Sequence, residues 1–167
     1  MADAGFINLS EACMAATIAG TAQFRTVVGA VDATAALTSI HRNCTDENNE
    51  EFARPRALIF DGQSGTRRRM ATTRVLTNAP MFVDFEFPIL AEHADDAGNL
   101  LQEHFQASLA DFKNSIGLII EQMEALVGQA GYLFITEIEL GSRVLMEHAK
   151  AGPADYWLAQ FTMHWQG

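Results

Sequence analysis

The chain has 167 residues, of which 49% are hydrophobic and 19% charged, which suffices for one core of ordinary size. Twenty-one acidic residues against eleven basic ones give a formal net charge of −10, which argues against a general nucleic-acid-binding protein. The sequence has neither a basic N-terminal segment followed by an apolar run nor an apolar stretch approaching ~20 residues, so we expect a soluble protein without a signal peptide or a membrane contact.

The N-terminal part of the chain predicts helices. Asn8-Leu-Ser-Glu11 resembles a capping box, and the helix that it would start, Leu9–Thr21, carries small residues along one stripe, which suits close packing against a sheet. Asp32 resembles the N-cap of a second, short helix through Ile40, although β-branched residues there leave a strand open. The polar, charged segment from His41 to Arg54 predicts an exposed, mobile loop.

The middle of the chain predicts strands. Arg56–Phe60 is expected to form a strand that follows Pro55, and the segment 63–69 is expected to form a flexible basic tip. A strand over 70–77, a turn at Asn78-Ala-Pro80 and a strand over 81–89 follow. Alternate residues of the last strand, Phe85 and Phe87 among them, form an apolar face.

The strongest helical pattern starts at Asp95 or Asp96 and ends at Val127, with apolar residues at helical spacing. A strand is predicted over 132–140, then an irregular connection over 141–153, and then a closing strand whose apolar residues alternate strictly with mostly polar ones. This order predicts a single α+β domain over residues 1–167: a mostly antiparallel sheet with one long helix and shorter N-terminal helices packed on one face. The expected core residues are Phe85, Phe87, Phe105, Phe112, Trp157, Phe161 and Trp165.

Two groups of polar residues are candidates for chemistry. His41 and Cys44 would serve as half of a metal site or as a nucleophile with its base, but no second pair has zinc-like spacing and the surrounding loop is polar. Glu92, His93 and His104 gather with Asp95 and Asp96 near the expected start of the long helix, where the helix dipole accounts for acids. We interpret both groups as structural, and we expect no catalytic residue, no bound metal and no cofactor.

The remaining signals concern redox state and surface charge. The spacing of Cys13 and Cys44 indicates no disulfide framework, which favours a reduced intracellular protein. The arginines at 67–69, with Arg74, form the only basic cluster. It would contact phosphate or, in better agreement with the acidic composition of the chain, an acidic patch on a neighbouring subunit. The third alternative is a solvated loop without a partner molecule. The expected subunit contacts are Arg67, Arg68 and Arg69 with Asp46, Glu47, Glu50 and Glu51 of the acidic loop.

The order of the predicted elements resembles that of the tail-terminator, or tail-completion, proteins of long-tailed bacteriophages and of prophage-derived particles, including those like gene transfer agents. The resemblance extends over nearly the whole chain. It rests on the Ala-rich opening helix Leu9–Thr21, on the strands Arg56–Phe60, Ala71–Thr77 and Phe82–Pro88, on the single long helix after them, and on the closing aromatic strand Trp157–Trp165.

This resemblance implies a non-enzymatic structural protein of a virion or phage-like particle. In that family, subunits form a hexameric ring that caps the tail tube and presents the surface for the head-proximal neck or connector protein. The chain would then be assembled in the bacterial cytoplasm and lie at the tail–head junction. DNA would pass through the lumen without specific binding, and acidic residues facing the lumen would repel its phosphates.

Two other functions remain open. One is a small-molecule- or metal-binding α+β domain, an enzyme included, that uses His41 and Cys44 together with Glu92 and His93. The other is an adaptor of a different secretion or contractile assembly, which differs from the tail protein only in its partner.

Overall fold

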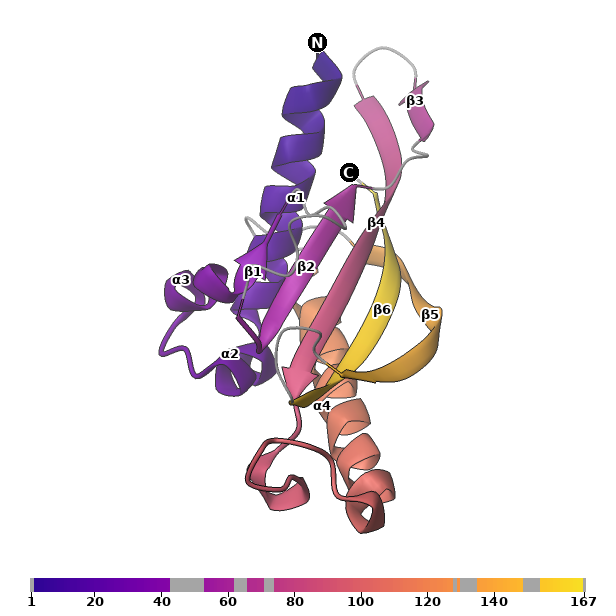
Figure 1. Cartoon of the computed structure of the whole chain (residues 1–167). Helices are drawn as coiled ribbons and strands as arrows, with labels where there is room; N and C mark the ends of the chain where they lie inside the picture. The colour runs from indigo at the N-terminus through magenta and orange to yellow at the C-terminus, as the bar shows by residue number, and fades with distance from the viewer. Residues whose placement is uncertain are drawn as a thin grey trace.

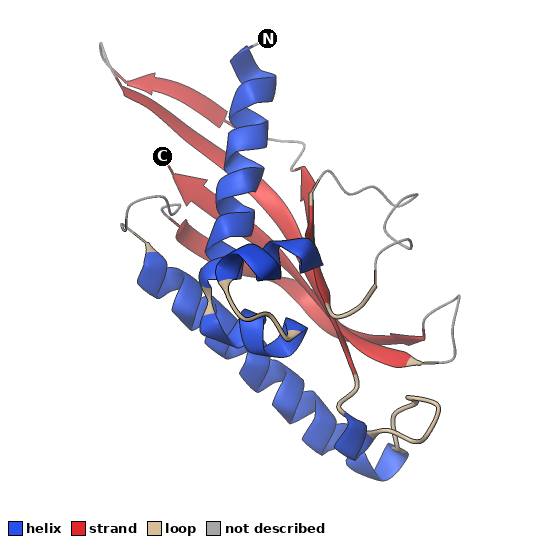
Figure 2. Ribbon diagram, turned by 90° about the vertical axis from the view of Figure 1, so that its left-hand side faces the viewer, coloured by secondary structure: helices blue, strands red, loops and turns tan. Residues whose placement is uncertain are grey.

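The fold class is α+β, as the sequence predicts (Figure 1). The computed structural model describes residues 2–42, 53–61, 66–70, 74–127, 129, 135–148 and 154–166. In this part of the chain, helices cover one face of a single mixed sheet, and Figure 2 shows α1, α2 and α4 together on that face. None of these helices is long and apolar enough to pass through a membrane.

Within the described residues the sheet has six strands, in the order β1-β2-β4-β6-β5, with β3 pairing β4 outside this path. In chain order the strands are β1 Ile40–His41, β2 Arg56–Asp61, β3 Thr66–Met70, β4 Arg74–Pro88, β5 Ile135–His148 and β6 Asp155–Gln166. Only β1 and β2 pair in parallel; every other pairing among these strands is antiparallel. The sheet is therefore mostly antiparallel, as expected.

Local signals explain how the N-terminal helices begin and end. The helices are α1 Ala2–Gly20, α2 Ala22–Val28, α3 Ala33–Ala36 and the 3-10 helix η1 Leu37–Ser39. The Thr21 hydroxyl accepts a hydrogen bond from the Phe24 N–H and caps α2, which ends at Gly29 in the left-handed conformation. Asp32 caps α3 as predicted, because its side chain accepts a bond of 2.8 Å from the Ala35 N–H.

The predicted start of the first helix is wrong. Asn8 lies inside α1, which begins at Ala2, so the sequence resembling a capping box does not mark a helix end. The Phe24–Val28 region is helical as well. The segment predicted as a helix through Ile40 is α3 followed by η1, and the chain enters β1 at Ile40.

Three strand boundaries also differ from the prediction. Asn78–Pro80 makes no turn, because β4 runs unbroken from Arg74 to Pro88. Pro80 is tolerated there because it lies where the neighbour on one side of β4 changes: β3 pairs up to Asn78 and β2 pairs from Met81. The basic segment expected to be a flexible tip contains β3, and the connection expected over 141–153 contains the second half of β5.

Strand β5 pairs with β6 along most of its length, but the pairing register shifts at two places, between Ile135 and Glu137 and between Leu140 and Val144. Such bulges allow a long strand to follow its neighbour while it bends. The second irregularity contains Gly141 and Ser142, which predict a break in a strand rather than its continuation. The closing hairpin therefore ends at the His148–Asp155 pair.

Aromatic side chains dominate the core between the sheet and the helices. Phe85, Phe87, Phe112, Trp157 and Phe161 are all buried. Phe112 stacks on Trp157 at a ring-centroid distance of 5.9 Å, and Phe85 meets Phe161 edge-on at 5.8 Å. Phe105 packs on the rim of this core against Trp157, whereas the side chain of Trp165 lies outside the described part of the structure.

The opposite face of the sheet is less polar than the alternation of β6 indicates. Tyr156 and Leu158, both on that face, are also buried. A buried ionic group lies on the same side: the Glu86 carboxylate accepts hydrogen bonds from Arg54 Nε at 2.7 Å and from Arg56 Nε at 2.8 Å. The Arg54 guanidinium also lies 3.7 Å from the centre of the Tyr156 ring.

Candidate functional site

A compact segment connects β4 to α4 Phe105–Leu126 and forms the floor of the candidate site. It contains two 3-10 helices, η3 Ala91–His93 and η4 Gln102–His104. Between them the Asp95 carboxylate accepts hydrogen bonds from the N–H groups of Ala97 and Asn99, each at 2.9 Å. These bonds, that from Asn99 first, lower the pKa of Asp95 below its usual value.

Gly98 is required by this turn. Its φ of +84° lies in the left-handed region, and a Cβ there would come within 3.2 Å of the Ala154 Cβ. The Leu101 N–H then bonds to the His93 carbonyl, which returns the chain to η3. The turn therefore occupies residues that the sequence assigns to the long helix, and that predicted helix start is wrong.

The turn brings two histidines and two carboxylates together. His93 Nε2 lies 2.7 Å from Asp111 Oδ2 on α4, and His93 Nδ1 lies 3.1 Å from His104 Nδ1. Glu92 Oε1 lies 3.8 Å from His93 Nε2. We call Glu92, His93 and Asp111 the donor cluster, because one ligand atom from each lies within 4.8 Å of the others.

The members of the donor cluster differ in exposure. The His93 side chain is 10% exposed, whereas those of Asp111 and Glu92 are 45% and 68% exposed. The imidazole is therefore held on both sides by its contacts, and both carboxylates are partly accessible to solvent. Such an arrangement suits a ligand that enters from solvent and meets a preorganised nitrogen.

The two contacts of His93 restrict where its protons lie. A carboxylate only accepts, so the bond to Asp111 requires a proton on His93 Nε2. The contact between the two Nδ1 atoms requires a proton on one of them, supplied by His104 when His93 is neutral. His104 is at the same time the N-cap residue of α4, but its side chain makes no capping hydrogen bond.

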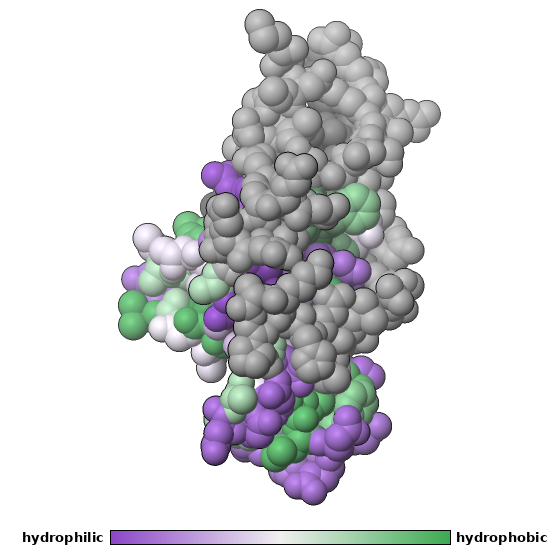
Figure 3. All heavy atoms as spheres, in the orientation of Figure 1, coloured by the Kyte–Doolittle hydropathy of each residue, from purple (hydrophilic) through white to green (hydrophobic). Residues whose placement is uncertain are grey.

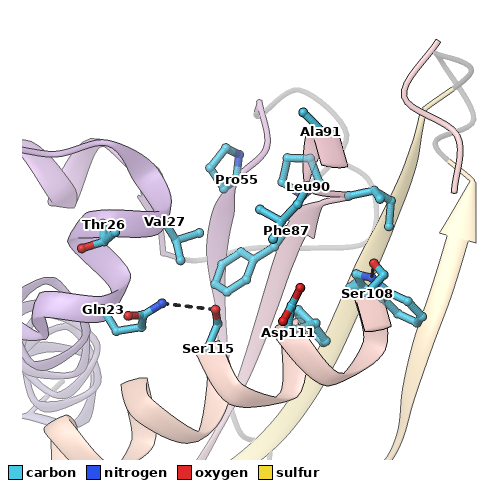
Figure 4. Close-up of a pocket in the computed structure, with 14 residues that line it drawn as sticks. Gln23, Thr26, Val27, Pro55, Phe87, Leu90, Ala91, Ser108, Asp111 and Ser115 are labelled. Carbon is cyan, nitrogen blue, oxygen red and sulfur yellow. Dashed lines mark hydrogen bonds between the residues drawn. The ribbon is translucent and has the colours of Figure 1, made fainter. Parts of the chain in front are cut away.

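A pocket of about 450 Å³ opens beside the donor cluster and shares Asp111 with it. Figure 4 shows Asp111, Ser108 and Ser115 on α4, opposite Phe87 and Leu90, with Gln23 of α2 at the far side. The Gln23 amide donates to the Ser115 hydroxyl at 3.1 Å, and the Trp157 indole N–H donates to the Ser108 hydroxyl at 2.9 Å. The lining is mostly apolar, and Asp111 is the only acidic or basic residue among the described residues that form it.

The residues predicted to act as sites lie in different parts of the molecule. Arg67, Arg68 and Arg69 are consecutive in β3, opposite Thr77, Leu76 and Val75 of β4. Cys44 and the acidic residues Asp46, Glu47, Glu50 and Glu51 lie outside the described residues. His41 lies on β1 and is not a member of the donor cluster; partial burial and the nearby Arg56 guanidinium lower its pKa.

Of the residues that meet at the donor cluster, Glu92, His93 and His104 are identified from the sequence, but Asp111 is not. Its signal is a spacing of seven residues, two helical turns, from His104, which puts both residues on one side of α4. The sequence predicts that the acids at 95 and 96 act on the dipole of α4, but that helix begins at Phe105 and has no acid in its first turn. That assignment is therefore wrong, and Asp95 stabilises its own turn.

A second feature lies at the other end of the molecule. Strand β4 pairs with β6 only from Asn78 onward and with β2 only from Met81, so among the described strands Arg74–Thr77 pair with β3 alone. We call β3 and Arg74–Thr77 the arm. Figure 1 shows the arm near the N-terminal end of α1, and the segment before α4 at the opposite end.

The visible surface carries exposed apolar side chains away from the arm. In Figure 3 hydrophobic surface is visible over the α2–α3 region and again near the start of α4, where hydrophilic residues surround it. Val31 and Leu37 are 89% and 42% exposed in the first region, and Leu90 is 53% exposed before η3. Single exposed apolar residues are common on monomers, so these alone do not define an interface.

Compared with known proteins, the chain matches no protein-family model and no curated protein.

Proposed function

We propose that this chain is a non-enzymatic structural subunit of a phage tail or phage-like particle. In this proposal it acts as a tail terminator: copies form a ring that caps the tail tube and joins it to the head-proximal neck or connector protein. The observation that carries the proposal is the basic arm on an otherwise acidic chain.

The arm has the properties of a contact that is completed by another molecule. A two-stranded hairpin is marginal in water unless it packs on something further. Residues 66–78 hold four of the eleven basic residues, all arginine, and no acidic one, whereas the whole chain has a net charge of −10. An arginine-rich arm therefore complements the body of another copy of the same chain.

A contact between an arm and a different surface of the next copy is heterologous, and such contacts repeat from one subunit to the next. They close into a ring if the rotation permits, and otherwise extend into a filament. The excess of acids left on the bodies would repel DNA phosphate in a lumen, so that DNA passes without specific binding. Assembly in the bacterial cytoplasm and a final place at the tail–head junction belong to the same proposal.

The two end strands of the sheet, β1 and β5, are poorly suited to a subunit contact in which a strand of another copy is added to the sheet. β1 is only two residues long, and β5 is interrupted at two places along its pairing with β6. Short and bulged edge strands resist pairing with another chain. The subunit contact is therefore expected at the arm, through its arginines.

The test is the mass of the assembly with and without the arm's charge. We expect sedimentation velocity to show a discrete oligomer of the wild-type chain that dissociates as salt is raised, because exposed charge contacts are screened. In the Arg67→Glu/Arg69→Glu variant we expect half of the chains to assemble only at a higher protein concentration than in the wild type. A tenfold rise in this concentration corresponds to an association weakened by ~1.4 kcal/mol.

A matched control is Arg42→Glu/Lys113→Glu, which changes the net charge by the same amount at two exposed residues outside the arm. We expect this control to assemble like the wild-type chain. A wild-type chain that stays monomeric at high concentration and low salt contradicts the proposal. An equal loss of assembly in both variants contradicts the assignment of the contact to the arm.

The alternative function, based on His41 and Cys44, gains no support from the geometry. Of its four residues, Glu92 and His93 lie in the donor cluster, His41 lies on β1, and Cys44 is outside the described residues. A metal-binding role therefore rests on the donor cluster and is compatible with a structural subunit.

A further inference from the structure

The donor cluster combines one imidazole and two carboxylates from separate elements. Glu92 and His93 come from η3, and Asp111 comes from the second turn of α4. We propose that these three side chains bind one divalent transition-metal ion, for which zinc fits best, and that His104 is a positioning residue for His93. This site is independent of the proposed ring.

The distances agree with a site that closes on a metal by small movements. Zinc binds imidazole nitrogen at ~2.0–2.1 Å and carboxylate oxygen at ~2.0–2.2 Å, so two ligand atoms on one tetrahedral ion lie roughly 3.3–3.5 Å apart. His93 Nε2 is 2.7 Å from Asp111 Oδ2 and 3.8 Å from Glu92 Oε1. Rotation of two exposed carboxylates brings both distances into this range while the buried imidazole stays in place.

The second ring nitrogen of His93 has a hydrogen-bond partner that can orient the imidazole as a metal ligand. A ligating histidine donates its other ring N–H to a fixed acceptor, which sets its tautomer and orientation. Here His93 Nδ1 faces His104 Nδ1 at 3.1 Å. With metal bound, the His93 proton lies on Nδ1 and is donated to His104, whose own proton lies on Nε2; the metal takes the place of the Nε2 proton that faces Asp111.

The donor set also selects the kind of ion. One nitrogen and two oxygens without a thiolate suit zinc, manganese and ferrous iron better than soft copper(I), and imidazole makes the site less suited to magnesium or calcium. Among manganese, ferrous iron and zinc, the affinity of a given site is normally highest for zinc. A fourth position remains for water on the side where Asp111 borders the pocket.

Binding would fasten η3 to α4 across the connecting turn. The contacts between these two elements include the His93–Asp111 bond, and Asp111 is partly exposed. A metal bound only by the folded chain stabilises it in proportion to the logarithm of the metal concentration above its dissociation constant. The melting temperature is therefore expected to rise when zinc is added.

The experiment is a zinc titration of the metal-free chain, by competition with a chromophoric chelator, together with the visible spectrum after cobalt is added. We expect one tightly bound ion per chain and a cobalt spectrum with nitrogen and oxygen ligands. Asp111→Asn and Glu92→Gln preserve shape and remove one ligand charge each, so both should weaken zinc binding. Circular dichroism checks that each variant is folded.

The matched control is Asp96→Asn, which removes one charge from an exposed side chain of the same connecting segment, outside the donor cluster. We expect this variant to bind zinc like the wild-type chain. His104→Ala should weaken binding by about 10- to 100-fold, as is usual for a residue that orients a ligand. His104→Gln, which keeps an acceptor, should restore part of this loss.

Each outcome decides the proposal. If the wild-type chain binds no zinc, or if Asp111→Asn and Glu92→Gln bind it as well as the wild-type chain, the site does not exist. If Asp96→Asn weakens binding as much as the ligand variants, the effect is one of local charge only. Loss of zinc binding in the two ligand variants, with an unchanged control, supports the site whether or not the chain forms a ring.

Discussion

The buried carboxylate of Glu86 is expected to be a large single contribution to stability. Its side chain is 7% exposed and accepts hydrogen bonds from Arg54 and from Arg56, whose own side chain is only 1% exposed. Glu86→Gln keeps the size and one acceptor of the side chain but removes the negative charge between two guanidinium groups. Arg56 then stays buried without the charge of that carboxylate.

Removal of one partner of a buried ion pair costs about 3–5 kcal/mol, because the remaining charge is left in a medium that solvates it poorly. Since glutamine retains an acceptor, we expect the lower end of this range, about 3 kcal/mol. For a chain of this size that loss lowers the melting temperature by roughly 6–12 °C. Arg54→Ala should cost less, roughly 1 kcal/mol, because Arg54 is 24% exposed and solvent replaces part of its contacts.

The assay is urea denaturation of the wild-type chain, the two variants and Glu121→Gln, which makes the same chemical change at an exposed site on α4. We expect Glu121→Gln to remain within ~0.5 kcal/mol of the wild-type chain. A Glu86→Gln variant equally close to the wild-type chain would show that the buried group is hydrated or easily rearranged. A larger loss for Arg54→Ala than for Glu86→Gln would also refute the argument from burial.

Four further substitutions have expected outcomes. Ser108→Ala should cost about 1–3 kcal/mol of unfolding free energy, since it leaves the buried Trp157 N–H without its acceptor; thermal denaturation measures the loss. Gly117→Ala should stabilise the folded chain by up to about 1 kcal/mol, because α4 has open space for a Cβ there. Gly98→Ala should destabilise it, because Gly98 has a positive φ and a Cβ would crowd Ala154. The two melting temperatures should therefore shift in opposite directions. The pKa of His41 is lowered in the folded chain, so the unfolded chain binds a proton more readily and the free energy of unfolding should fall as the pH drops below 6.5. Chemical denaturation between pH 7.5 and pH 5 measures this fall, which should be smaller in the His41→Gln variant.

Much of the fold follows from local patterns in the sequence. The strict alternation around Phe85 and Trp157 gives two neighbouring antiparallel strands, and the helical spacing through Phe112 gives α4. Both patterns work because one face of each element meets the same apolar core. The cap at Asp32 is equally local, since its bond to the Ala35 N–H spans three residues.

The errors come from places where pairing with distant segments outweighs a local signal. Pro80 predicts a turn, but in β4 it lies where one neighbour gives way to the next, so its missing N–H breaks no pairing with the described residues of β2 or β3. Gly141 predicts a loop, but β5 pairs with β6 on both sides of Gly141, and the pairing register shifts between Leu140 and Val144. No local pattern contains this information.

The donor cluster illustrates the same limit for function. Glu92 and His93 are adjacent, but Asp111 is eighteen residues away from His93 and reaches it only because the turn at Asp95–Asn99 folds back. The helical pattern extends the predicted long helix through that turn, which would separate the same residues along a helix axis. Recognition of the cluster therefore depends on where the helix starts.

The continuity of β4 has a mechanical consequence. The strand that forms one side of the arm enters the sheet directly and pairs with β6 over the eleven residues from Asn78 to Pro88. A pull on the arm along the strand axis loads that whole ladder in shear at once, so that its hydrogen bonds share the force and do not break one after another. A contact made through the arm would therefore load strands that are extensively paired, because β4 continues from the arm into the sheet without a break between Arg74 and Pro88.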